Sequence, residues 1–120
     1  MIEGGIVTLY VSNMDRAVQF YTDTLGLKLR MRGGNMWSEI DAGGGLVLGL
    51  HGTHPGSPQP GQNGATQLTL NVSGSLEQVV ETLTARGVVF PRPIRGENRV
   101  RVTQCLDPDG NALSLHGTGS

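Results

Sequence analysis

The sequence predicts an α+β domain made of two copies of one unit, each a strand, a helix and three further strands. The first observation is a short repeat, because LGLHG at residues 48–52 returns as LSLHG at residues 113–117. The second is a wider self-similarity, in which residues 6–27 align with residues 67–88 without a gap. A chain of 120 residues holds one hydrophobic core but not two independent domains. The copies are therefore expected to be halves of one domain, residues 1–120.

The first copy opens with a strand and a helix. Residues 6–12 alternate between two sets of side chains, the period of a strand with one apolar face. The apolar residues from 14 to 25 have helical spacing, with Ser12 or Asn13 as the N-cap and Gly26 as the glycine that ends the helix. Glycine-rich turns separate the strands expected next: KLRMRG (28–33), NMWSEIDA (35–42) and LVLGLHG (46–52).

The second copy repeats this order. Residues 67–72 alternate as a strand, and residues 76–83 have helical spacing, with Ser73 or Ser75 as N-cap and Gly87 as the final glycine. The turn DPDGN (107–111) precedes the last of three more strands. These are expected at VVFPRPIR (88–95), RVRVTQCL (99–106) and ALSLHG (112–117).

The proline and glycine content sets the module boundaries. We expect a first module at about residues 4–52, a connector at 53–65 and a second module at about 66–117. His54 falls in the connector, where no function is expected. Pro91 and Pro93 predict that the strand around them is irregular or lies at a sheet edge.

Composition excludes several classes of protein. A formal net charge of -1 without a basic cluster argues against binding to nucleic acid or to an acidic membrane surface. The sequence has no apolar run of membrane-spanning length, and MIEGGIV lacks the pattern of a secretory signal, so we expect a cytoplasmic protein. Its single cysteine, Cys105, excludes an internal disulfide.

Strand alternation predicts a second, largely polar face in each half. Simple exposure to solvent is one explanation for such a face. A cleft enclosed by the two polar faces is the other, and Trp37 and Tyr10 favour it because large aromatic side chains are poor choices for a wet surface. We assign Thr103 and Cys105 to this face as well. The residues expected to bind a ligand there are Thr8, Tyr10, Trp37, Glu39, His51, Gln67, Thr69, Asn71, Arg101, Ser114 and His116.

Two segments resemble the vicinal oxygen chelate superfamily, which includes glyoxalase I, extradiol dioxygenases, fosfomycin resistance enzymes and bleomycin resistance proteins. They are VSNMDRAVQFYTDTLGLKL (11–29) and the closing DPDGNALSL (107–115). The resemblance covers nearly the whole chain. It implies two tandem βαβββ modules that form a curved cup of eight strands, and commonly a homodimer.

The resemblance also implies the places of four metal ligands, which here are Ile6, Gly49, Gln67 and Ser114. Metal-dependent members carry His, Gln or Glu there, and only Gln67 retains such a side chain. We therefore expect no bound metal and no other cofactor. The alternative is a displaced metal site made by His51 and His116, two residues further along their strands, together with Glu39.

Two further residues could be catalytic, but each also has a purely structural interpretation. Cys105 is either a nucleophile or a small buried hydrophobic residue. Glu39 is either a general base or the ion-pair partner of Arg101 or Arg30. No glycine-rich phosphate loop precedes a helix, and DPDG has the composition of a turn rather than a calcium loop. We assign no catalytic residue.

The sequence favours a metal-free protein that binds and sequesters a small organic molecule in the cup, as the resemblance to bleomycin resistance proteins implies. The alternative is a lyase, isomerase or oxygenase. Such an enzyme would use a noncanonical set of metal ligands, or metal-free acid/base chemistry by Glu39, His51 or His116. A third possibility is an interaction module that binds no small molecule.

Overall fold

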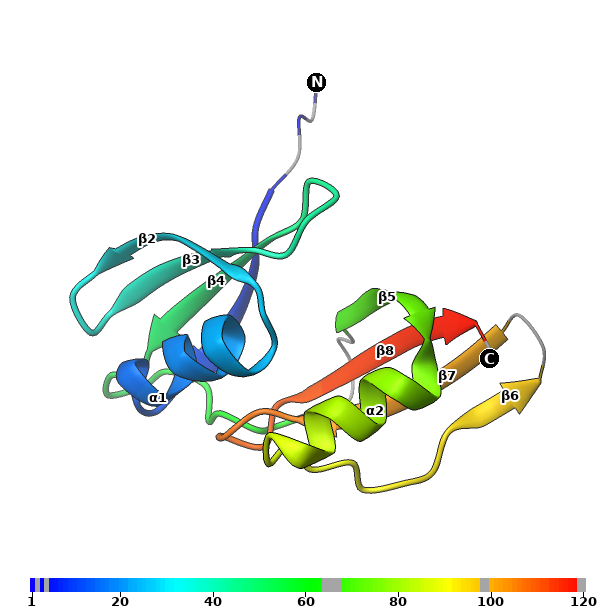
Figure 1. Ribbon diagram of the computed structural model, residues 1–120. Helices are drawn as coiled ribbons and strands as arrows, with labels where there is room; N and C mark the ends of the chain where they lie inside the picture. The colour runs from blue at the N-terminus through cyan, green and yellow to red at the C-terminus, as the bar shows by residue number, and fades with distance from the viewer. Residues whose placement is uncertain (2, 4, 64–67, 98–99, 119–120) are drawn as a thin grey trace. The chain divides into compact units, whose positions relative to one another are not determined.

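A computed structural model describes residues 1, 3, 5–63, 68–97 and 100–118. The chain separates into two compact units, Met1–Gln62 and Asn63–Ser120, called here the N-terminal and the C-terminal module. Each module carries a four-stranded mixed sheet and a helical segment in the order βαβββ (Figure 1). The predicted α+β class and its internal repeat are therefore confirmed. In the described part of the chain, no helix is long and apolar enough to cross a lipid bilayer.

The N-terminal module has the strand order β1-β4-β3-β2. β1 and β4 run parallel, and the other neighbouring strands run antiparallel. A π-helical segment, η1, directly continues the first helix. The elements are β1 (Val7–Val11), α1 (Met14–Gln19), η1 (Phe20–Thr24), β2 (Lys28–Gly33), β3 (Trp37–Asp41) and β4 (Val47–Gly52).

The helical segment begins and ends where local chemistry predicts. The Asn13 side chain accepts a hydrogen bond from the Arg16 amide at 3.1 Å, which satisfies a backbone donor in the first turn. Gly26 adopts a φ of 79°, the left-handed conformation that side chains disfavour. Gly26 had been predicted, and Asn13 is one of the two caps that the sequence allowed, the other being Ser12.

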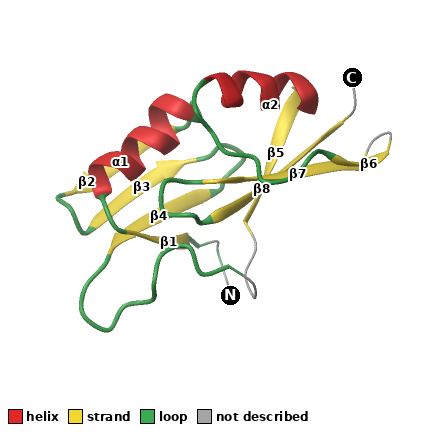
Figure 2. Cartoon of the chain, turned by 90° about the horizontal axis from the view of Figure 1, so that it is seen from below, coloured by secondary structure: helices red, strands yellow, loops and turns green. Residues whose placement is uncertain are grey.

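The helix α1 covers one face of its sheet (Figure 2). Ile40, Leu48 and Leu50 are fully buried on that face, because strand register places them side by side. The Ser38 hydroxyl, also buried there, donates to the Met14 sulfur of α1 at 3.3 Å. The opposite face, which we call the open face of the N-terminal module, carries the alternate residues of these strands.

The C-terminal module repeats this topology with the strand order β5-β8-β7-β6, and β5 and β8 are parallel. Ser75 caps the helix by accepting from the Gln78 amide at 3.4 Å, and Gly87 follows the helix with a φ of 91°. The elements are β5 (Leu68–Ser75), α2 (Leu76–Ala85), β6 (Arg95–Glu97), β7 (Val100–Leu106) and β8 (Ala112–Thr118).

The residue types of two loops in this module explain their conformations. Around Pro91 and Pro93 only an isolated bridge forms, between Val89 and Leu106, so the irregular strand predicted there is reduced to the three residues of β6. In the DPDGN turn the buried Asp107 carboxylate accepts two hydrogen bonds from Asn111. One comes from the backbone N–H at 2.8 Å and the other from the side-chain Nδ2 at 2.9 Å. The turn is therefore held by its own side chains.

The prediction that Arg101, Thr103 and Cys105 share the polar face is wrong. In the β7–β8 register Cys105 pairs with the buried Leu113, and Arg101 pairs with Gly117. Gly117 lies against α2, since a β-carbon added there would be 3.3 Å from Cβ of Leu76. Directly paired residues point to the same side of a sheet, so all three lie on the helix-covered face. Arg101 forms an ion pair with Glu77 of α2, which is why a charged residue is accommodated there.

Candidate functional site

Five of the predicted ligand-binding residues come together on the open face of the N-terminal module. β4 supplies the centre of this face, with β1 and β3 on either side. Strand register places Thr8, Gly49 and Glu39 in one row across these strands. It places Tyr10, His51 and Trp37 in the next row. Thr8 is exposed, whereas the Tyr10, Trp37, Glu39 and His51 side chains are half-buried.

The second row is a continuous aromatic surface. The His51 ring centroid lies 4.9 Å from that of Tyr10 and 5.9 Å from that of Trp37. The loop after β4 brings the ring centroid of His54 to 5.8 Å from that of His51. Sequence reasoning had dismissed His54 because it lies in the connector. Its proximity depends on the path of that loop, which no periodicity encodes.

The imidazole of His51 has a defined tautomer. Its Nδ1 lies 2.6 Å from the Gly52 carbonyl oxygen, and a carbonyl only accepts hydrogen bonds. Nδ1 must therefore carry the proton. In the neutral ring this leaves Nε2 as a hydrogen-bond acceptor or a base.

The Trp37 indole lies directly over Gly49. A β-carbon added at Gly49 would clash with Cη2 of the indole, lie 2.9 Å from its Cζ2 and lie 3.0 Å from Cγ2 of Ile6. The indole Nε1–H donates to Glu39 Oε2 at 3.0 Å, which fixes the ring in this position. Glu39 also faces Arg30, with a 3.7 Å separation between Oε1 and Nε. The ion pair that had been considered for Glu39 is therefore made with Arg30, not with Arg101.

This geometry bears on the metal positions that the resemblance implies. Ile6 and Gly49 offer no donor atom, and the indole occupies the space that a ligand side chain at position 49 would need. Ser114 is buried and hydrogen-bonded, and Gln67 lies outside the described residues. The described residues at these positions do not fit a divalent cation. Within the described chain no three His, Cys, Asp or Glu side chains gather as a metal-binding group.

The open face of the C-terminal module carries four more of the predicted residues. Thr69 and Ser114 lie in one row, and Asn71 and His116 lie in the next. The same register adds Gln104 beside Ser114 and Val102 beside His116, and the sequence analysis had missed both. These two take the places that Glu39 and Trp37 hold in the N-terminal module.

The replacement of tryptophan by valine changes the surface. Gln104 Nε2 donates to Ser114 Oγ at 3.3 Å, so a side chain is present at the position equivalent to Gly49. A small pocket of about 100 Å³ opens over this row. Thr69, Arg92 and Arg95 lie along its wall. The two arginines are the other residues that sequence reasoning missed.

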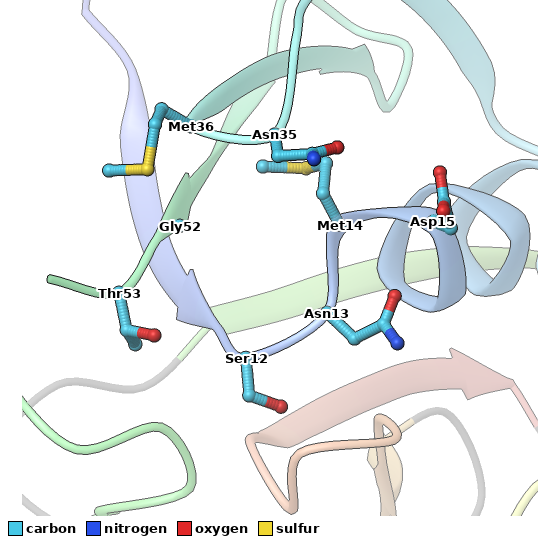
Figure 3. A pocket seen from close by; sticks show the side chains of 8 residues that line it. All are labelled: Ser12, Asn13, Met14, Asp15, Asn35, Met36, Gly52 and Thr53. Carbon is cyan, nitrogen blue, oxygen red and sulfur yellow. The ribbon is translucent and has the colours of Figure 1, made fainter.

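A larger pocket, of about 390 Å³, lies in the N-terminal module at the ends of β1 and β4 (Figure 3). The β2–β3 turn and the start of α1 complete it. It contains none of the predicted site residues. Its lining combines polar side chains with two thioethers: Ser12, Asn13, Met14, Asp15, Asn35, Met36, Gly52 and Thr53.

Cys105 is a buried hydrophobic residue rather than a nucleophile. Its side chain is fully buried, and burial raises the pKa of the thiol to about 11, with a smaller contribution from the charge of Asp107. The thiol is therefore protonated at neutral pH. Since the thiolate is the nucleophilic form, no reactive sulfur is available.

Comparison with known proteins supports the resemblance found in the sequence. Residues 5–115 match the model of the Glyoxalase/Bleomycin resistance protein/Dioxygenase superfamily. TnmS3, an antibiotic binding protein from Streptomyces sp. CB03234, is 25% identical with a TM-score of 0.78, over 99% of this chain and 98% of that one. A superfamily member from Sphaerobacter thermophilus DSM 20745 is 26% identical with a TM-score of 0.78, over 97% of each chain.

A third structure, TioX from Micromonospora sp. ML1, is 21% identical with a TM-score of 0.74, over 97% of this chain and 98% of that one. At that identity the likeness concerns the fold alone. The family match spans both βαβββ modules and the DPDGN turn. The chain therefore belongs to the Glyoxalase/Bleomycin resistance protein/Dioxygenase superfamily.

Proposed function

We propose that this protein binds a small, partly planar organic molecule without a metal ion, on the open face of the N-terminal module. The observation that carries the proposal is the position of Trp37 over Gly49. One indole both takes the space of a metal-ligand side chain and offers a flat apolar surface. Tyr10 and His51 extend that surface, and polar groups such as Thr8 lie in the adjacent row.

The energetics are adequate for a modest ligand. Covering about 100 Å² of one indole face contributes roughly 2 to 3 kcal/mol. Aromatic contacts with Tyr10 and His51 would add to this, and hydrogen bonds from the polar row would orient the ligand. The antibiotic-binding function of the similar protein TnmS3 is consistent with such a ligand.

Trp37 provides a direct test because it is the only tryptophan of the chain. A panel of planar compounds is titrated against the intrinsic fluorescence. We expect saturable quenching or a spectral shift with a subset of the panel. Mass spectrometry of the recovered compound is expected to show it unchanged. The proposal is wrong if no compound changes the Trp37 fluorescence, or if calorimetry detects no binding of any compound.

Metal-free catalysis is the second candidate, and the tautomer of His51 is the observation that favours it. Nε2 is unprotonated in the neutral ring and lies on the half-buried aromatic surface, as a general base requires. Recovery of a chemically altered compound, abolished in His51→Gln, would favour this candidate over sequestration. The variant keeps a polar side chain of similar reach but removes the base.

The assembly and location are also proposals. We expect a homodimer, as the family resemblance implies, and light scattering of the purified chain measures its mass. A cytoplasmic location is expected from the sequence, and fractionation of the source cells tests it. Neither proposal affects the ligand assay.

A further inference from the structure

We propose that the pocket on the open face of the C-terminal module binds an oxyanion, namely the carboxylate or phosphate group of a small organic compound. The inference goes beyond the proposed function and does not depend on it, because the pocket is lined by residues of the C-terminal module alone. The oxyanion pocket is defined by the residues that line it: Thr69, Arg92, Pro93, Arg95, Val102, Thr103, Gln104 and Ser114. Its volume of about 100 Å³ suits a small charged group rather than a whole ligand.

The charged side chains that line the pocket are all positive. Arg92 and Arg95 line it, and none of its lining residues is acidic. Arg95 pairs in register with Val102, so its side chain lies on the open face. Among the ion pairs between described residues, none involves either arginine. A guanidinium group matches the geometry of carboxylate and phosphate oxygens, which accept two parallel hydrogen bonds.

The uncharged wall is also compatible with an anion. Thr69 is exposed at the pocket and carries a hydroxyl donor. The Gln104 amide, which donates to Ser114, has a second N–H. Glu97 lies on the same side of β6 as Arg95 but two residues along the strand, and it is not part of the lining. Hydroxyl and amide donors beside two guanidinium groups form a site for an anion rather than for a cation.

The equivalent corner of the N-terminal module differs from the oxyanion pocket. At equivalent positions the N-terminal module has Trp37 and the carboxylate Glu39, whereas the C-terminal module has Val102 and the amide Gln104. The indole fills the space over Gly49, and the Glu39 carboxylate would repel an anion. The C-terminal module therefore has an open corner without a carboxylate, and Arg92 and Arg95 line it.

The test uses benzoate and phenyl phosphate as probes and benzamide as the neutral control. Binding to the full chain is followed by the NMR signals of the arginine Nε–H groups and by calorimetry. We expect benzoate and phenyl phosphate to shift the signals of Arg92 and Arg95, and to bind about tenfold or more tightly than benzamide. Equal binding of benzoate and benzamide would overturn the proposal. A response to inorganic phosphate alone would support the oxyanion site and identify phosphate as the preferred group.

Variants locate the site. Arg92→Gln and Arg95→Gln are each expected to weaken benzoate binding several-fold, whereas Arg16→Gln, at an exposed position of α1, leaves it unchanged. The double variant Val102→Trp with Ser114→Gly recreates the Trp37 arrangement and is expected to abolish benzoate binding with both arginines present. Unchanged binding in the folded variants contradicts the proposal, and the two exposed arginine variants decide the matter if the double variant does not fold.

Failure of this inference is distinct from failure of the proposed function. If planar compounds perturb Trp37 but charged and neutral probes bind alike, the ligand site stands and the oxyanion pocket is wrong. If benzoate shifts Arg92 and Arg95 but no planar compound perturbs Trp37, the oxyanion pocket stands and the proposed aromatic surface is wrong.

Discussion

The Trp37 indole lies over Gly49, so that a β-carbon at position 49 would be 2.9 Å from the indole Cζ2 and closer still to Cη2. Gly49 occupies the place at which metal-dependent relatives are expected to carry a ligand. The loss of that side chain and the presence of the indole are therefore one structural feature. The same feature creates the aromatic surface beside His51 on which the proposed function depends.

Gly49→Ala is expected to destabilise the protein by about 1 to 3 kcal/mol, because the new methyl group must displace the indole or Ile6 from a close contact. Urea unfolding measures the change. Gly5→Ala is the matched control, since a β-carbon at Gly5 meets no atom within 4 Å. An effect of Gly49→Ala no larger than that of Gly5→Ala would show that the indole does not fill this space.

Trp37→Ala is expected to weaken binding of a planar ligand by roughly 30-fold or more, which corresponds to the loss of about 2 kcal/mol of apolar contact. Calorimetry measures this, because the variant lacks the fluorescent residue. Met36→Ala is the matched control: Met36 lies next in sequence but lines the separate pocket of Figure 3. A larger loss in Met36→Ala than in Trp37→Ala would move the ligand to that pocket.

Arg101→Gln tests the corrected position of this residue. We expect a stability loss of about 1 kcal/mol or less, because the ion pair with Glu77 is partly exposed and screened by solvent. Affinity for the planar ligand and for benzoate is expected to stay unchanged, since the residue lies on the helix-covered face. A selective loss of ligand affinity without a loss of stability would return Arg101 to the binding site.

The raised pKa of Cys105 predicts a loss of stability at high pH. The folded state holds the thiol proton up to about pH 11, whereas the unfolded chain releases it at its ordinary pKa of 9.0. Stability is therefore fully present below pH 9 and falls as pH rises towards 11, by about 3 kcal/mol from this group. Urea unfolding at pH 8 and pH 10.5 measures the fall, which Cys105→Ala is expected to reduce. Alkylation by iodoacetamide at pH 7.5 is expected to occur only after unfolding.

An identical pH dependence in wild type and Cys105→Ala would show that other groups cause the fall. Rapid alkylation of the native protein at pH 7.5 would contradict the burial of the thiol. Both measurements are independent of any ligand.

The local sequence predicted most of the elements, although the strand expected at 88–95 forms only at Arg95–Glu97. The strand and helix periods, the helix caps and the glycines at 26 and 87 act within a few residues, so the chain alone predicts them. For each cap the sequence left two candidates, of which the structure has Asn13 and Ser75. The repeat of these signals at one offset predicted the two modules. The alternation in β1, β3 and β4 likewise placed Tyr10, Trp37 and His51 on one face correctly.

Alternation alone gave the wrong face for β7. That strand carries polar residues on both sides, so alternation alone does not show which side faces the helix. The pairing of Cys105 with Leu113 decides the parity, and this pairing depends on how the DPDGN turn aligns β7 with β8. A shift of one residue in such a pairing exchanges every side chain between the faces.

Only the tertiary structure could reveal which side chains fill space and which leave it open. The sequence showed that Gly49 lacks a donor atom, but the indole of Trp37 above it depends on register between neighbouring strands and on the hydrogen bond to Glu39. The approach of His54 to His51 and of Arg92 to the pocket beside Ser114 depends on loop paths. Short-range periodicity encodes the face on which a strand residue lies, whereas contacts between strands and loops are set by packing of the folded chain.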